Sequence, residues 1–248
     1  MPVSEDDHAL AARAVTDAGR LLVHLRECGG DGDGRSLGAR GDAAAHAALV
    51  ELLGAARPAD PVLSEEGHDD EARLESERVW IIDPLDGTRE FGEPGRVDWA
   101  VHVALVVDGT PVAGAVALPA MDVTFSTASP PPPPPARAGR LRVVVSRTRP
   151  PPVATGVASA LDADLVPLGS AGAKAMAVVR GEVDAYVHAG GQYEWDSAAP
   201  VAVATAAGLH ASRLDGSPLR YNAPEPWLPD LVVCRPDLAP AIIAAAAT

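Results

Sequence analysis

Six consecutive prolines at residues 130–135 constrain the fold of this chain more than any other stretch of its sequence. Proline has a fixed φ and no backbone N–H, so such a run adopts extended polyproline II structure and serves as a semi-rigid spacer in a surface loop. A ligand for a proline-recognition domain is the alternative interpretation. We therefore divide the chain into an N-terminal domain (1–129), a proline-rich linker (130–140) and a C-terminal domain (141–248).

The composition is that of a folded, acidic protein. The 248 residues are 47% hydrophobic and 22% charged, and 34 acidic against 20 basic residues give a net charge of −14. This excess argues against nucleic acid polymers and membrane surfaces as partners, because both require a basic face. The acidic N-terminus differs from a signal peptide, and no apolar run reaches the ~20 residues that span a bilayer. We expect a cytoplasmic protein that needs metal ions or a few cations to hold an anionic substrate.

The first half of the chain predicts two helices followed by a sheet. Apolar residues at helical spacing predict a helix from Ser4 to Cys28, a glycine-rich loop occupies residues 29–41, and a second helix starts near Asp42. Short apolar runs predict strands at residues 61–63, 79–82, 100–107, 112–118 and 123–126, with a hairpin turn at Asp108 and Gly109. Two helices before a largely antiparallel sheet predict an α+β protein.

The second half predicts a further α/β unit. We expect strands at residues 141–145, 183–188 and 231–234, helices at 153–161 and 171–180, a helix opening near Asp196, and a closing alanine-rich helix. His102 lies in one of the apolar strands of the first half, so we interpret it as a packed or hydrogen-bonded residue rather than a ligand.

The sequence WIIDPLDGTREF at residues 80–91 carries the clearest chemical signal. An apolar strand delivers Asp83 at its carboxyl end, and Asp86 follows three residues later, so both carboxylates can face one point. Gly87 and Thr88 then begin a helix whose free N–H groups suit a phosphate oxygen. Carboxylates are the ligands that Mg²⁺ prefers, often together with substrate phosphate. The alternative is an ordinary Asx turn.

Two other stretches carry acids next to a predicted strand or helix. Residues 63–66 (LSEE) form a short strand that ends in Glu65 and Glu66, and residues 194–199 (EWDSAA) place Asp196 before an apolar helix. Taken singly, the first reads as solvated acids and the second as a helix N-cap.

Together, these three elements resemble, in order and spacing, the inositol monophosphatase superfamily of metal-dependent, lithium-sensitive phosphomonoesterases. Residues 41–46 (GDAAAH), 63–66, 145–147 (VSR) and 169–174 (GSAGAK) are most similar to its CysQ-type 3′(2′),5′-bisphosphate nucleotidases. The chain departs from that pattern at Glu93, where relatives usually carry a polar or basic side chain, and in lacking a threonine before Asp42. The resemblance implies a layered αβαβα sandwich of the inositol monophosphatase and fructose-1,6-bisphosphatase type.

The resemblance also implies site residues, most of them in the N-terminal domain. Two or three Mg²⁺ ions would be held by Glu65, Asp83, Asp86, Asp196 and the carbonyl of Leu85. Thr88, hydrogen-bonded to Asp42 and assisted by Glu65, would orient or deprotonate the attacking water. The phosphate would bind Gly87 and Thr88, and the rest of the substrate would bind Ser146, Arg147, Ser170 and Lys174 of the C-terminal domain. Lys174 could equally be a surface residue of its helix.

The function that this resemblance implies is Mg²⁺-dependent hydrolysis of the 3′-phosphate of 3′-phosphoadenosine 5′-phosphate, which yields AMP and phosphate. Inositol-1-phosphatase and fructose-1,6-bisphosphatase activities are the alternatives within the superfamily. A non-catalytic metal-binding scaffold is the alternative from another class. The expected partner is a small phosphorylated anion, and the resemblance is compatible with a homodimer.

Overall fold

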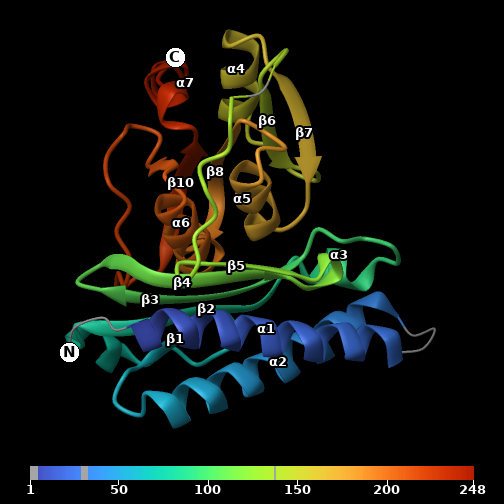
Figure 1. The fold of residues 1–248 in the computed structure, drawn as a ribbon, viewed down its shortest axis with the longest axis vertical. Helices are drawn as coiled ribbons and strands as arrows, with labels where there is room; N and C mark the ends of the chain where they lie inside the picture. Colours follow the sequence, from blue (N-terminus) through green and yellow to red (C-terminus); the bar gives the residue numbers. More distant parts are fainter. Residues whose placement is uncertain (1–4, 29–32, 137) are drawn as a thin grey trace.

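A computed structural model of the chain describes residues 5–28, 33–136 and 138–248, and its helices and sheets alternate in five layers (Figure 1). Helices α1 and α2 form the first layer, a five-stranded sheet the second, α5 and α6 the third, a second five-stranded sheet the fourth, and α4 and α7 the fifth. This arrangement confirms the predicted αβαβα sandwich.

The N-terminal layers comprise two long helices and a largely antiparallel sheet, as predicted. Their elements are α1 (Glu5–Cys28), α2 (Gly34–Ala56), β1 (Val62–Ser64), β2 (Arg78–Asp86), β3 (Ala100–Val107), β4 (Thr110–Leu118) and β5 (Val123–Ser126). The strands pair in chain order, β1 with β2 in parallel and the others antiparallel. All nine residues of β2 are buried because helices cover both faces of this sheet, and its end therefore delivers Asp83 and Asp86 into the interior.

The C-terminal layers form a mixed sheet with helices on both faces. Their elements are β6 (Arg142–Ser146), α4 (Pro152–Ala160), β7 (Asp164–Leu168), α5 (Ala171–Val179), β8 (Ala185–Tyr193), α6 (Glu194–Ala206), β9 (His210–Ser212), β10 (Trp227–Cys234) and α7 (Ala239–Ala246). The strand order is β7-β6-β8-β10-β9. The largest apolar cluster surrounds α5 and α6 and draws residues from both sheets, from Leu63 to Val233. This shared core brings the ends of β2, α5 and α6 to one place.

The predicted start of the second helix was wrong, and two strands were missed. Helix α2 begins at Gly34 rather than near Asp42, so part of the predicted loop is helical, while residues 29–32 of that loop lie outside the described residues. Packing requires a glycine at position 38 of this helix, because a Cβ there would lie 2.6 Å from Cγ2 of Thr88. Strands β7 and β9 were not predicted, because β7 is mostly exposed at a sheet edge and β9 has only three residues.

Residues 130–135 contain no helix or strand and run along the molecule from β5 to the C-terminal sheet (Figure 1). The prolines pack closely on the turns that follow α5 and α6, since a Cβ at Gly181 or Gly208 would lie 3.0 Å from Pro134 or Pro133. The division into two domains stays a prediction. None of the helices in the described residues is long and apolar enough to cross a membrane.

Candidate active site

Two aspartates at the end of β2 form the centre of the candidate site. Asp83 is 1% exposed and Asp86 is 7% exposed. The pairing of β2 with β3 is regular up to Asp83, which lies opposite His102, and shifts before Asp86. The Oδ1 atom of Asp83 accepts a hydrogen bond from the N–H of Leu85 at 3.1 Å, which fixes the turn between the two acids. This irregularity turns both carboxylates toward the interior beside His102.

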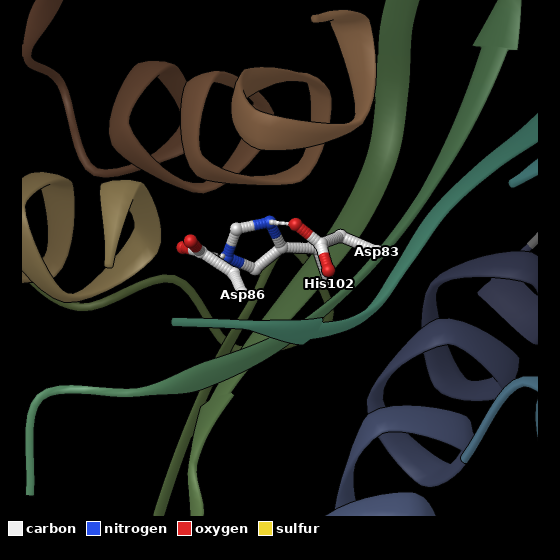
Figure 2. Close-up of side chains that lie close together, drawn as sticks. All are labelled: Asp83, Asp86 and His102. Carbon is white, nitrogen blue, oxygen red and sulfur yellow. Dashed lines mark ion pairs between the residues drawn. The ribbon is translucent and has the colours of Figure 1, made fainter. Parts of the chain in front are cut away.

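His102 lies between the two carboxylates (Figure 2). Its Nε2 atom is 3.3 Å from Oδ2 of Asp86, and its Nδ1 atom is 3.9 Å from Oδ2 of Asp83 and 3.0 Å from the carbonyl oxygen of Trp195. Burial opposes the charged imidazole, but the hydrogen bond and charge of Asp86 outweigh it and raise the pKa of His102. Ligand atoms of these three residues lie within 4.8 Å of one another.

The sequence analysis did not predict that His102 lies between Asp83 and Asp86. The interpretation of His102 as a hydrogen-bonded residue of an apolar strand is correct, but its partners include the acids of the site. The register of the predicted sheet could have revealed this position. Antiparallel pairing of the predicted strands at 79–82 and 100–107 brings position 102 close to Asp83.

Asp86 is held by helix α5 as well as by His102. Its Oδ2 atom accepts hydrogen bonds from Oγ of Ser170 at 2.5 Å and from the N–H of Gly172 at 2.7 Å. Burial acts against ionisation, but His102, the charge of Lys174 and the Ser170 hydroxyl together lower the pKa of Asp86 to about 2. Asp86 is therefore ionised, and the hydroxyl of Ser170 is already engaged by it.

Glu65 and Asp196 approach the same centre from β1 and α6. Burial and the charges of Asp196 and Asp86 raise the pKa of Glu65 to about 7, and burial and the charge of Asp86 raise that of Asp196 to about 7. The pKa of Asp83 is also raised, by burial and by Asp86, Glu65 and Asp196. Glu65 and Asp196 remain outside the 4.8 Å group of Asp83, Asp86 and His102. The four acids are thus electrostatic neighbours that need positive charge to ionise together.

Asp196 is not the N-cap residue of its helix, which is Tyr193, but it takes part in the cap as the N3 residue of a capping box. Helix α6 begins at Glu194, and Asp196 lies in its first turn, where the carboxylate accepts a hydrogen bond from the N–H of Tyr193 at 2.7 Å. Glu194, the first residue of the helix, is buried, and its carboxylate accepts hydrogen bonds from the N–H groups of Asn222 and Ala223.

Thr88 and Asp42 connect α3 (Thr88–Gly92) to α2. The Oγ1 atom of Thr88 lies 3.3 Å from Oδ1 of Asp42 and 3.1 Å from the carbonyl oxygen of Leu85, and it can donate to either. Burial and the charge of Glu66 raise the pKa of Asp42 to about 6, although the Thr88 hydroxyl lowers it. Gly87 precedes α3 with a φ of 89°, a left-handed conformation that favours glycine.

A cavity of about 260 Å³ opens beside this centre. Its lining includes these predicted residues: Asp86, Gly87, Thr88, Ser146, Arg147, Ser170, Lys174 and Asp196. It also includes residues that were not predicted: Arg89, Glu90, Arg149, His188 and Gln192 among them. Asp42, Glu65, Asp83 and Leu85 lie outside the lining. A larger cavity of about 520 Å³ between α1 and the β4–β5 edge contains none of the predicted site residues.

The two predicted cations of this cavity are both engaged. Lys174 is 5% exposed and donates to the carbonyl oxygens of Gly169 and Ser170, so the alternative that it is a surface residue was wrong. Burial lowers the pKa of Lys174. The guanidinium of Arg147 is bound by Glu90 and by Glu93, at 2.6 Å from the latter. The unusual glutamate at position 93 therefore has a structural partner.

Arg89 and Arg149 differ from these two cations. Both are exposed, both line the cavity, and within the described part of the chain neither forms an ion pair. Among the residues that the structure describes, they are the cations of the cavity lining that have no carboxylate partner.

Comparison with known proteins agrees with this geometry. The family model described as "Inositol monophosphatase family" matches residues 7–130 and 137–247. The chain belongs to this family. A 3′-phosphoadenosine 5′-phosphate phosphatase of Mycobacterium leprae is 53% identical over 96% of this chain and 92% of that protein. The 3′(2′),5′-bisphosphate nucleotidase CysQ of Escherichia coli is 35% identical over 75% of this chain and 80% of that protein.

The solved structures of the family agree with the fold. CysQ from Bacteroides thetaiotaomicron superimposes with a TM-score of 0.82 at 27% identity, over 93% of this chain and 97% of that one. The comparisons confirm the predicted resemblance and the predicted enzyme class, a phosphoric monoester hydrolase, because the curated relatives are named as a phosphatase and a nucleotidase.

Proposed function

We propose that this chain is a Mg²⁺-dependent bisphosphate nucleotidase that removes the 3′-phosphate of 3′-phosphoadenosine 5′-phosphate to give AMP and phosphate. The observation that carries the proposal is the contact between an acid cluster, whose members Asp83 and Asp86 are buried, and a cavity lined by four cations, in a chain whose net charge is −14. The mycobacterial relative, named for this substrate, supports the choice of nucleotide.

The acid cluster has the chemistry that a divalent cation requires. Asp83 is buried with its pKa raised by neighbouring carboxylates, and an ion would replace this repulsion by attraction. We expect Glu65, Asp83, Asp86, Asp196 and the carbonyl of Leu85 to hold two or three Mg²⁺ ions. When bound, Mg²⁺ neutralises phosphate oxygens and lowers the pKa of water.

We expect Thr88 and Asp42 to orient the attacking water. The Thr88 hydroxyl can donate to Asp42 or Leu85, which leaves its oxygen free to accept a hydrogen bond from water at the cavity wall. Asp42, with a pKa near 6, is matched to accepting a proton close to neutral pH, and Glu65 is expected to assist. The N–H groups of Gly87 and Thr88, at the same wall, are proposed to donate to the phosphate.

The remainder of the substrate would occupy the C-terminal side of the cavity. Ser146 and Arg147 contribute to its wall, and Arg149 extends the positive charge beyond them. We assign Ser170 and Lys174 a positioning role in place of substrate binding, because Ser170 donates to Asp86 and Lys174 donates to the carbonyl oxygen of Ser170. A second phosphate would therefore meet Arg149 and Arg89 before it meets Lys174.

A phosphate-release panel tests the proposal. Purified protein with Mg²⁺ is given 3′-phosphoadenosine 5′-phosphate, inositol 1-phosphate and fructose 1,6-bisphosphate at equal concentration, and EDTA and the Asp83→Asn variant serve as blanks. We expect the nucleotide to be hydrolysed fastest and EDTA to abolish release. Faster turnover of either sugar phosphate would overturn the substrate assignment, and absence of release from all three would favour the non-catalytic scaffold. The homodimer and the cytoplasmic location stay predictions.

A further inference from the structure

A buried arginine outside the cavity ties the loop of Glu65 to another part of the chain. Arg73 lies in the short 3₁₀ helix η1 (Glu71–Glu75) and is 1% exposed. Its guanidinium donates from Nε and Nη2 to Asp69, at 2.6 and 2.8 Å, and from Nη1 to Oδ1 of Asn222 at 2.7 Å. Asn222 returns a hydrogen bond from Nδ2 to the carbonyl oxygen of Arg73 at 3.1 Å. Arg73 thus holds both its own loop and residues 222–226, which we call the bridging segment.

The other side of the bridging segment is held by the start of α6. Glu194 is 1% exposed, and its carboxylate accepts hydrogen bonds from the N–H groups of Asn222 and Ala223 at 2.6 and 2.9 Å. The N–H of Glu194 donates to the carbonyl oxygen of Pro226 at 2.8 Å. Asp196 follows Glu194 by two residues. The bridging segment therefore lies between the loop that carries Glu65 and the helix start that carries Asp196.

The bridging segment is held by two buried charged side chains, Arg73 and Glu194. Burying a guanidinium and a carboxylate costs several kcal/mol each in desolvation, which hydrogen bonds and mutual attraction must offset. The carbonyl oxygens of Ala223 and Pro224 point to Arg73, while N–H groups of the same segment point to Glu194. Asn222 also adopts a left-handed φ of 64°, which costs free energy for any residue with a Cβ.

The bridging segment connects the elements of two acids, Glu65 and Asp196, that repel each other. Among the charges around Glu65, that of Asp196 does most to raise its pKa. Glu65 lies in an exposed turn after a three-residue strand, where its N–H donates to the carbonyl oxygen of Ile82 at 3.4 Å. A tether between this loop and the start of α6 would oppose the repulsion in addition to that bond.

We propose that Arg73, Asn222 and Glu194 are positioning residues that set the placement of Glu65 relative to Asp196 and thereby the affinity of the site for divalent cations. This inference rests on the proposed function, because it assigns both acids to the metal site. Partners that orient metal ligands typically contribute 10–100-fold in metal affinity.

The test measures Mn²⁺ binding by the full chain directly, by titration calorimetry, together with thermal unfolding in EDTA. Arg73→Met removes the guanidinium, and Asn222→Gly removes only the side-chain bonds while a glycine keeps the left-handed backbone and its N–H bond to Glu194. Arg235→Met is the matched control, because Arg235 binds Asp184 at the opposite end of β8. All three variants lose hydrogen bonds of a buried or half-buried arginine. Only Arg73→Met and Asn222→Gly lose bonds between Arg73 and the bridging segment.

We expect the Mn²⁺ dissociation constant to rise about tenfold or more in Arg73→Met, by a smaller factor in Asn222→Gly, and not at all in Arg235→Met. Unchanged Mn²⁺ affinity in folded Asn222→Gly and Arg73→Met, with wild-type protein binding Mn²⁺, would overturn the inference. An equal loss of affinity in Arg235→Met would also overturn it, since general destabilisation would then explain the effect. Failure of wild-type protein to bind Mn²⁺ would instead contradict the proposed function.

Discussion

A Cβ atom at position 172 would lie 2.0 Å from Nε2 of His102, so α5 can reach the acid cluster only with glycine as its second residue. The same close approach allows the N–H of Gly172 to donate to Asp86 at 2.7 Å. Helix α5 belongs to the C-terminal layers and His102 to the N-terminal sheet, so this contact fixes the two halves of the site relative to each other.

We expect Gly172→Ala to reduce activity about 10–100-fold, because the new methyl group must displace His102 and loosen the hold on Asp86. Overpacking should also cost roughly 1–3 kcal/mol of unfolding free energy. Gly156→Ala in α4 is the control: its Cβ meets open space, and alanine there should stabilise the helix by about 0.5–1 kcal/mol. Steady-state rates and thermal unfolding measure both variants, and wild-type activity in Gly172→Ala would show that His102 and Asp86 tolerate movement.

Asp83→Asn should abolish turnover without harming the fold. The amide oxygen can still accept the hydrogen bond from Leu85, and the loss of a buried charge removes repulsion from the other acids. We therefore expect activity to fall by at least about 10²-fold, as when one preorganised electrostatic group is lost. The unfolding temperature in EDTA should equal or exceed that of the wild type. Full turnover by the variant would refute the proposed metal site.

Local pattern pointed to Asp83 and Asp86, which follow an apolar strand. Glu65 and Asp196 were assigned to the site only through the resemblance to a family, and the structure makes all four electrostatic neighbours. The αβαβα layering likewise came from resemblance to a family, since local patterns indicated only helices followed by a sheet.

What the sequence could not predict depends on contacts between distant segments. His102 owes its role to strand register, and the start of α2 at Gly34 depends on packing, since Gly38 contacts Thr88 where local propensity favours a loop. Lys174 was ambiguous because helical position alone does not show that α5 is buried between two sheets. The charge of a side chain indicates that it needs a partner but does not identify that partner.

The stability of the metal-free protein should fall as pH rises from about 4.5 to about 7. Glu65 and Asp196 have pKa values near 7 in the folded chain, against 4.5 and 3.8 for the free groups. Between these values the folded state binds more protons than the unfolded state, so unfolding releases protons and becomes easier as pH rises. Asp83 and Asp42 act in the same direction.

Two histidines oppose this trend. Burial lowers the pKa of His188 to about 4 and also lowers the pKa of His210, so both groups favour folding as pH rises toward 6.5. Two histidines should be outweighed by four carboxyl groups. Thermal unfolding in EDTA across this pH range measures the slope, and saturating Mg²⁺ should flatten it because bound cations restore ionisation. A metal-free protein that becomes steadily more stable between pH 5 and 7 would contradict the assignment of these acids to one cluster.

Arg149 should distinguish substrates with two phosphates from those with one. It lines the cavity without an ion-pair partner in the described residues, whereas Arg147 is bound by Glu90 and Glu93. A charged hydrogen bond contributes about 1.5–3 kcal/mol, and exposure to solvent reduces this, so Arg149→Ala should raise KM for 3′-phosphoadenosine 5′-phosphate about tenfold.

The same variant should leave KM for adenosine 3′-monophosphate unchanged, because that compound lacks the second phosphate. Arg20→Ala is the control for loss of a surface charge, since Arg20 lies on α1 away from this cavity. High salt should narrow the difference between wild-type protein and Arg149→Ala, because screening weakens an exposed charge pair. Equal increases in KM for both nucleotides would show that Arg149 serves the reacting phosphate, and the second phosphate would then require another cation, with Arg89 the remaining unpaired choice in the cavity lining.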